Sequence, residues 1–181
     1  MNYHTQMEAA KNGLLTPQIQ LVAQKECRDP QWVLERVAAG TIAIPANIGH
    51  TCLSAEGIGE GLRTKINVNL GISGDAKDYQ LEMEKVRMSV AMGAESIMDL
   101  SNYGKTRAFR EKLIESSSAM IGTVPMYDAI GYLEKDLLEI TPEDFLRVVE
   151  AHAKAAGIPL RFVASKLVEG AALVFDALRL S

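Results

Sequence analysis

Three side chains that can contact a small polar molecule recur at a fixed spacing near the middle of the chain. Asn69, Met98 and Tyr127 lie 29 residues apart from one to the next, and each comes in or just after an apolar run typical of a buried strand. An asparagine amide both donates and accepts hydrogen bonds. A tyrosine adds an aromatic wall with a hydroxyl, and a methionine adds a polarizable, adaptable contact. This ordered row predicts a small-molecule site.

The spacing also predicts how the three residues come together. A separation of 29 residues matches one strand-helix unit of a parallel sheet, and the carboxyl ends of parallel strands open into one crevice. Each residue has a simpler interpretation as well. A methionine in a strand is more often core than ligand, and an asparagine or tyrosine at a strand end often does no more than cap a loop.

Strand and helix patterns alternate along the chain. Thr16-Pro17 and Asp29-Pro30 each give an N-cap followed by a proline at the first helical position. We expect helices over residues 4–12, 17–27, 30–40, 77–92, 105–116, 142–156 and 166–179, a short helical segment after Pro125, and strands over residues 41–47, 64–70, 96–100, 120–124 and 159–164. Such βα repetition predicts a parallel sheet with right-handed crossovers.

The number of repeats predicts an α/β fold that is part of a (β/α)8-type barrel. About four βα units with parallel strands follow a helical N-terminal extension, whereas a closed barrel takes about 250 residues. We expect the extension over residues 1–40 and a half-barrel-like domain over residues 41–181. Half a barrel leaves unpaired edges and an apolar inner face. Such a chain must open into a two-layer fold, associate with another copy, or be an incomplete piece.

Composition excludes several classes of function. The net charge is −4 and there is no run of Lys or Arg, which argues against nucleic acid as a partner. No apolar stretch reaches the roughly 18 residues that span a bilayer. The N-terminus lacks the pattern of a secretory signal, so a cytoplasmic location is expected. The two cysteines, Cys27 and Cys52, form no disulfide or metal-binding framework.

Several other groups have both a functional and a structural interpretation. Gly71–Gly74 precedes a helix and could cradle a phosphate, although an ordinary βα turn needs the same glycines. Lys65 could face a phosphate or cover a sheet edge. His50 is expected in an exposed loop, and His152 as a hydrogen-bonded core histidine. Asp99 could position a ligand or cap the next helix.

Five collinear segments resemble one family. Phosphomethylpyrimidine synthase, the ThiC family, is closely similar over Thr5–Pro17, Ile44–His50, Gly59–Gly71, Ile97–Ser101 and Ile121–Tyr127, and the resemblance covers roughly residues 5–155. It implies a (β/α)8 barrel, usually a homodimer. It also implies a radical rearrangement of aminoimidazole ribotide in thiamine biosynthesis, with S-adenosylmethionine and a [4Fe-4S] cluster. By this resemblance Asn69, Met98 and Tyr127 line the ribotide pocket.

The chain also departs from the family pattern. Val163 or Ala164 stands where the family has a substrate-binding histidine. The second half of the barrel is absent, together with its Ser-Arg-Gly loop, zinc-type metal site and C-terminal cysteine motif. Cluster assembly takes at least three thiolates, and Cys27 and Cys52 match no cluster motif. We therefore expect that this chain alone binds no family cofactor and performs no radical chemistry.

Two functional hypotheses follow. In the first, the chain contributes to phosphomethylpyrimidine synthesis as a homodimer or with a complementing half-barrel protein. In the second, it is a non-catalytic homologue or a binding module for an imidazole ribotide or a similar phosphorylated metabolite. The divergent tail, residues 157–181, could cover the sheet, form a dimer interface or be accidental sequence.

Overall fold

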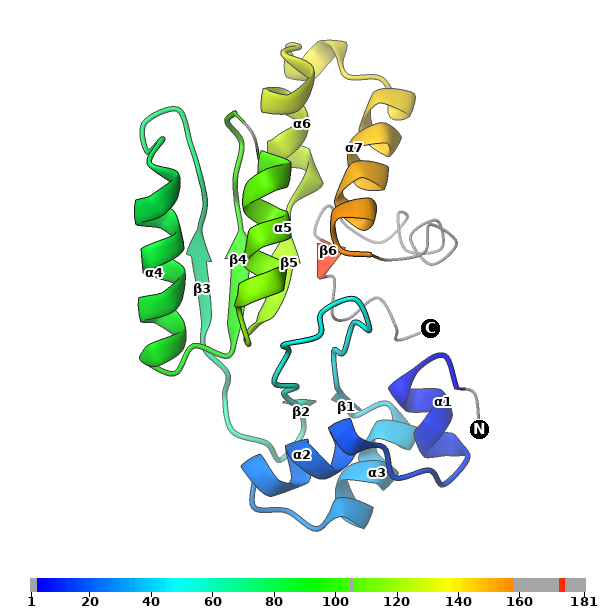
Figure 1. Cartoon of the computed structure of the whole chain (residues 1–181). Helices are drawn as coiled ribbons and strands as arrows, with labels where there is room; N and C mark the ends of the chain where they lie inside the picture. Colours follow the sequence, from blue (N-terminus) through cyan, green and yellow to red (C-terminus); the bar gives the residue numbers. More distant parts are fainter. Residues whose placement is uncertain (1–2, 105, 158–172, 175–181) are drawn as a thin grey trace.

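The computed structural model describes residues 3–104, 106–157 and 173–174 (Figure 1). Its N-terminal unit contains the helices α1 (Gln6–Lys11), α2 (Pro17–Lys25) and α3 (Pro30–Ala39). The Thr16 hydroxyl accepts a hydrogen bond from the Ile19 amide at 3.1 Å, and Gly40 ends α3 in the left-handed conformation. These are the start and stop signals expected from sequence, because a cap depends only on residues within one turn.

A short hairpin follows α3. Strand β1 (Ile42–Ala43) pairs antiparallel with β2 (Ile58–Gly59). Neither strand of the pair could be recognised in the sequence as a hairpin, because two residues are too few to show a strand period. A Cβ atom on Gly59 would overlap the backbone of Thr41 and Ile42, so the close pairing requires glycine. The hairpin adds Ile42 to the hydrophobic core under α2 and α3.

The central sheet has the order β3-β4-β5-β6. Strands β3 (Asn67–Leu70), β4 (Ser96–Asp99) and β5 (Met120–Thr123) run parallel, as expected. Strand β6 (Leu173–Val174) pairs antiparallel with β5. The helix expected over residues 166–179 is therefore wrong at residues 173–174, where apolar residues suited to either element pair with the sheet instead. The strand expected at residues 159–164 lies outside the described residues, as do Val163 and Ala164.

Helices α4 (Tyr79–Ala91), α5 (Thr106–Ser116), α6 (Pro125–Leu133) and α7 (Pro142–Ala155) follow the parallel strands, with a short 3-10 turn, η1, at Leu137–Glu139. Ile97 and Ile121 point from the sheet into a core formed with Val86 of α4, Phe109 of α5 and Val149 of α7. The described elements thus form an α/β arrangement with three parallel strands. Of the described helices, none is both long and apolar enough to cross a bilayer.

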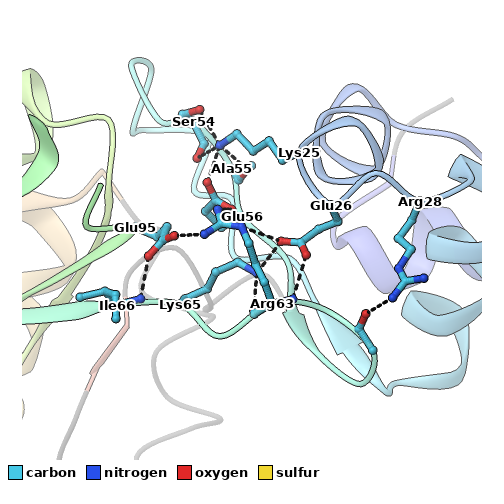
Figure 2. Close-up of polar contacts among 11 residues, drawn as sticks. Lys25, Glu26, Arg28, Ser54, Ala55, Glu56, Arg63, Lys65, Ile66 and Glu95 are labelled. Carbon is cyan, nitrogen blue, oxygen red and sulfur yellow. Dashed lines mark hydrogen bonds and ion pairs between the residues drawn. The ribbon is translucent and has the colours of Figure 1, made fainter. Parts of the chain in front are cut away.

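The N-terminal unit lies at the amino-terminal end of the parallel strands (Figure 1). Ion pairs join the two parts there, and Figure 2 shows Arg63 at their centre. Its guanidinium pairs with Glu95, which precedes β4, and lies 3.5 Å from carboxylate oxygens of Glu26 and Glu56. Lys65 binds Glu26 at 2.6 Å. Lys65 therefore belongs to this junction. Of its two interpretations, the ion pair favours the structural role over the phosphate contact.

The segment after β1 crosses to the ends of two distant helices. The Asn47 amide donates to the carbonyl of Ala156, just after α7, at 2.9 Å. The His50 Nε2 lies 2.6 Å from the carbonyl of Ser117, just after α5. His50 is buried, so its expected exposure is wrong. Both side chains cap helix ends whose carbonyls lack partners inside the helix.

Candidate functional site

The parallel register places Asn69 directly beside Met98, and Met98 beside Gly122. Side chains alternate between the two faces of a strand. Ile97 and Ile121 occupy the buried face, so Asn69 and Met98 share the opposite one. Asn69 is exposed and Met98 half-buried. These two groups meet on one face of the sheet and remain accessible to a ligand.

Tyr127 comes from a different element. It lies in the first turn of α6, where its amide donates to the carbonyl of Val124 at 3.0 Å. The residue is 48% exposed. Because α6 begins directly after β5, Tyr127 lies at the carboxyl edge of the sheet. Gly131 of α6 packs so closely on the carbonyl of Asn102 that a Cβ atom there would overlap it. This contact fixes α6 against the loop that follows β4.

A buried polar network lies beneath this edge, on the helix side of the sheet. The Arg110 guanidinium of α5 reaches two carboxylates: its Nε is 3.2 Å from Asp99 of β4, and a terminal nitrogen is 3.1 Å from Asp128 of α6. His152 of α7 binds Asp128 through Nε2 at 2.8 Å and Thr123 of β5 through Nδ1 at 3.0 Å. The network therefore ties α5, α6 and α7 to two of the parallel strands.

The charges in this network follow from burial and pairing. Burial lowers the pKa of His152, and the nearby Arg110 charge lowers it further, against the opposing effect of Asp128. Burial alone would raise the pKa of Asp128, but hydrogen bonding to His152 and the Arg110 charge hold it below its usual range. A neutral imidazole that donates from Nε2 to Asp128 and accepts at Nδ1 from the Thr123 hydroxyl satisfies both of these contacts.

The network shows which of the interpretations given above applies to His152 and to Asp99. His152 is the hydrogen-bonded core histidine that the helix pattern predicted. Asp99 pairs with Arg110 and accepts a hydrogen bond from the Ser101 amide at 3.0 Å. Its carboxylate therefore has a structural role and does not position a ligand. Sequence reasoning missed Arg110 and Asp128 completely. Their 18-residue separation crosses two elements and leaves no periodic signal.

The glycine loop after β3 is not suited to a phosphate. The Gly71 amide donates to the Glu82 carboxylate at 3.1 Å, and the Ile72 amide to the Ser101 hydroxyl at 3.0 Å. The Ser73 amide donates to the carbonyl of Ala76. With these three N–H groups engaged, the loop serves the βα turn. The phosphate interpretation of Gly71–Gly74 is therefore not favoured.

A second hollow lies elsewhere. A cavity of about 730 Å³ opens beside α4 and the end of α5, lined by Tyr79, Met83, Arg87, Lys112 and Ser117 among others. It contains none of the three residues that the sequence predicted for a site. Its charged groups are on exposed helix surfaces, where charges are normally solvated.

The cysteines do not fit a metal cluster. Cys27 and Cys52 are both exposed and unpaired with each other. The Cys52 thiol lies 3.0 Å from the carbonyl of Ser117, so it belongs to the capping segment after β1. Within residues 3–104, 106–157 and 173–174, no group of three His, Cys, Asp or Glu side chains is arranged to hold a metal ion. The donors present here therefore do not match the three thiolates that a cluster needs.

Comparison with known proteins gives one consistent family. The sequence model of the radical SAM ThiC family matches residues 5–164. The chain is 61% identical over 153 residues to the phosphomethylpyrimidine synthase of Clostridioides difficile (strain 630), an overlap that covers 84% of this chain and 35% of that protein. It is 60% identical over 154 residues to the same enzyme of Alkaliphilus metalliredigens (strain QYMF), covering 85% and 35%. The chain thus spans about a third of the length of these relatives.

Proposed function

Because this chain belongs to the radical SAM ThiC family, we propose that it supplies the ribotide-binding part of a phosphomethylpyrimidine synthase in thiamine biosynthesis. Its ligand is aminoimidazole ribotide, held by Asn69, Met98 and Tyr127. The observation that carries this proposal is the register that sets Asn69 beside Met98 on an accessible face of the sheet. Tyr127 follows at the carboxyl edge on α6, and open α/β sheets bind ligands at this edge.

Each of the three residues has a physical role in this proposal. The Asn69 amide hydrogen-bonds a polar edge of the imidazole or ribose. The Tyr127 ring covers an aromatic face, and its hydroxyl reaches a polar atom. Met98 supplies an adaptable apolar contact between them. The Arg110 network holds the strands and α6 so that these side chains keep their places.

We propose further that the complete enzyme is a (β/α)8 barrel to which this chain contributes about half. The 181 residues contain two cysteines, whereas the cluster of a radical SAM enzyme takes at least three thiolates. Cluster ligands must then come from outside these residues. A second copy of the chain would repeat Cys27 and Cys52, which match no cluster motif, so we propose that the cluster ligands come from a segment with its own cysteine motif.

A second candidate function is ligand binding without catalysis, which needs only the groups on the accessible face and edge of the sheet. The two can be separated by mixing the chain with the remaining two thirds of the Clostridioides difficile relative as a separate polypeptide. Cleavage of S-adenosylmethionine that depends on both polypeptides supports the enzyme. Ribotide binding with no cleavage in the mixture supports the binding module.

Isothermal titration of the chain with aminoimidazole ribotide tests the proposed site. We expect Asn69→Ala and Tyr127→Phe each to weaken binding by about 1–3 kcal/mol, because each removes a polar group paired to the ligand. Asn12→Ala and Tyr3→Phe, in the N-terminal unit, are matched controls and should bind normally. Titration curves of Asn69→Ala and Tyr127→Phe that overlay the parent curve would show that the site assignment is wrong.

A further inference from the structure

Asn69 is the end of a short chain of side-chain hydrogen bonds across β3 and β4. The Ser96 hydroxyl donates to the Asn67 Oδ1 at 2.8 Å, and the Asn67 Nδ2 donates to the Asn69 Oδ1 at 2.9 Å. We call these three residues the amide ladder. Ser96 and Asn67 are register partners. The ladder therefore lies on the same face of the sheet as Met98.

The ladder gives Asn69 a direction. Its carbonyl oxygen is engaged by Asn67, while its Nδ2 has no partner within the part of the chain that the structure describes. Because an amide carries its acceptor and its donors on opposite sides of the same carbon, holding the oxygen turns the N–H groups outward. Asn69 is exposed, so those N–H groups face the space that a ligand would occupy.

We propose that Asn67 and Ser96 are positioning residues that fix the Asn69 amide as a hydrogen-bond donor. This proposal rests on the proposed function and defines its specificity. The ligand atom opposite Asn69 must be an acceptor, such as an unprotonated ring nitrogen or a sugar or phosphate oxygen. A ligand that places an N–H group opposite the Asn69 Nδ2 sets one donor against another. Neither donor then has an acceptor, so such a ligand is rejected.

The opposite direction is a defined rival. If Asn67 donated to Ser96 and Asn69 donated to Asn67, the Asn69 carbonyl would point outward and select a donor. Asn67→Asp separates the two arrangements, because a carboxylate only accepts. A carboxylate at position 67 requires Asn69 to turn its Nδ2 inward. The variant therefore reverses the direction of Asn69 in the proposed arrangement, whereas in the rival one Asn69 keeps its direction and only the bond with Ser96 reverses.

The first measurement needs no ligand. In the NMR spectrum of the free chain, one Nδ2 proton of Asn67 should be shifted downfield of its geminal partner, whereas the Asn69 pair should resemble a free amide. In Asn67→Asp the downfield proton should belong to Asn69. A hydrogen-bonded Nδ2 proton of the Asn69 side chain in the unmodified chain would overturn the proposal.

The second measurement is titration with aminoimidazole ribotide. Asn67→Asp should weaken binding by roughly tenfold or more, since the outward donor is lost and a carbonyl replaces it. Asn67→Ala frees Asn69 to take either direction, so about half of the molecules bind and the loss is about twofold. Asn102→Asp adds the same charge after β4 without touching the ladder and is the control. Binding by Asn67→Asp that equals the Asn102→Asp control would refute the donor role.

The two measurements separate this proposal from the function on which it rests. A ladder with the proposed direction in a chain that does not bind the ribotide supports the orientation and contradicts the ligand. Normal ribotide binding with a reversed ladder contradicts the orientation alone. Thermal unfolding of each variant checks that the exposed substitutions leave the fold intact.

Discussion

Arg110 shows how one buried charge can hold several elements together. Its side chain is 1% exposed and pairs with Asp99 and Asp128. Arg110→Met would leave both carboxylates buried without their cation, which costs about 3–5 kcal/mol when one partner of a buried pair is removed. Urea denaturation measures this loss. Arg107→Met, on the exposed side of the same helix, removes a surface pair with Glu111 and should cost less than about 1 kcal/mol. Equal losses in the two variants would contradict a structural role for the network.

His152 gives the chain a pH dependence of known sign. Its pKa is lowered by burial, so the native chain binds fewer protons at this site than the unfolded chain. The contribution of His152 is then fully present above the ordinary histidine pKa of about 6.5 and is lost as pH falls below it. Between pH 8 and pH 5 the urea midpoint should fall more steeply for the parent than for His152→Gln, whose amide can donate and accept hydrogen bonds but does not titrate. Parallel curves would show that His152 does not titrate in this range.

At the level of elements, α6 is placed by a glycine. Gly131 contacts the carbonyl of Asn102 with no room for a Cβ atom. We expect Gly131→Ala to push α6 away from the loop after β4, which moves Tyr127 and lowers ribotide affinity as well as stability. Overpacking of this kind costs about 1–3 kcal/mol. Gly74→Ala is the control, because a Cβ atom there has open space. Normal ribotide titration of Gly131→Ala would show that Tyr127 does not depend on this contact.

The elements differ in how well sequence predicts them, and the reason is the range of the interactions that fix them. Thr16 and Asp29 cap their own helices through residues two or three positions away, so the sequence predicts both helix starts. His50 meets Ser117 across 67 residues, and no local pattern could show that it is buried. The two-residue strands β1 and β2 depend in the same way on a partner elsewhere in the chain.

The residues of the candidate site also differ in how well the sequence predicts their neighbours. The even spacing of Asn69 and Met98 predicted that they would be neighbours, because βα units of equal length bring equivalent positions into register. Arg110 and Asp128 carry no such spacing, and their role emerges only when α5 and α6 pack on the sheet. The amide ladder is intermediate. Asn67 and Asn69 are visibly on one face from their alternation, but the direction of their hydrogen bonds depends on Ser96.

At the scale of the whole molecule, the two hydrophobic cores meet at a junction of charges. Burial alone would raise the pKa values of Glu26 and Glu95. Hydrogen bonds and nearby charges hold both pKa values below their usual range, from Lys65 and Arg63 for Glu26 and from Arg63 for Glu95. Carboxyls with lowered pKa values stabilise the folded state above their unfolded pKa of about 4.3 and lose that contribution below it. We therefore expect a second fall in stability below pH 4.3, distinct from the histidine step. Circular dichroism during acid titration measures this fall. A single step for the parent would contradict the assignment of the two falls to His152 and to the junction carboxylates.

Arg63 is the part of this junction that can be tested directly. It is the cation of Glu95, and it also faces Glu26 and Glu56. Lys25 and Lys65 still pair with Glu56 and Glu26 when Arg63 is replaced, so Glu95 is the carboxylate left without a cation. Arg63→Met should then let the N-terminal unit separate more often from the sheet while both cores stay folded. Limited proteolysis between residues 59 and 66 should be faster by roughly fivefold, the change that about 1 kcal/mol in a local opening gives. Arg87→Met removes an exposed arginine of α4 and serves as the control. If both variants were cleaved at the parent rate, the hydrophobic contacts alone would hold the two parts together, and the ion pairs would contribute only as ordinary surface pairs do.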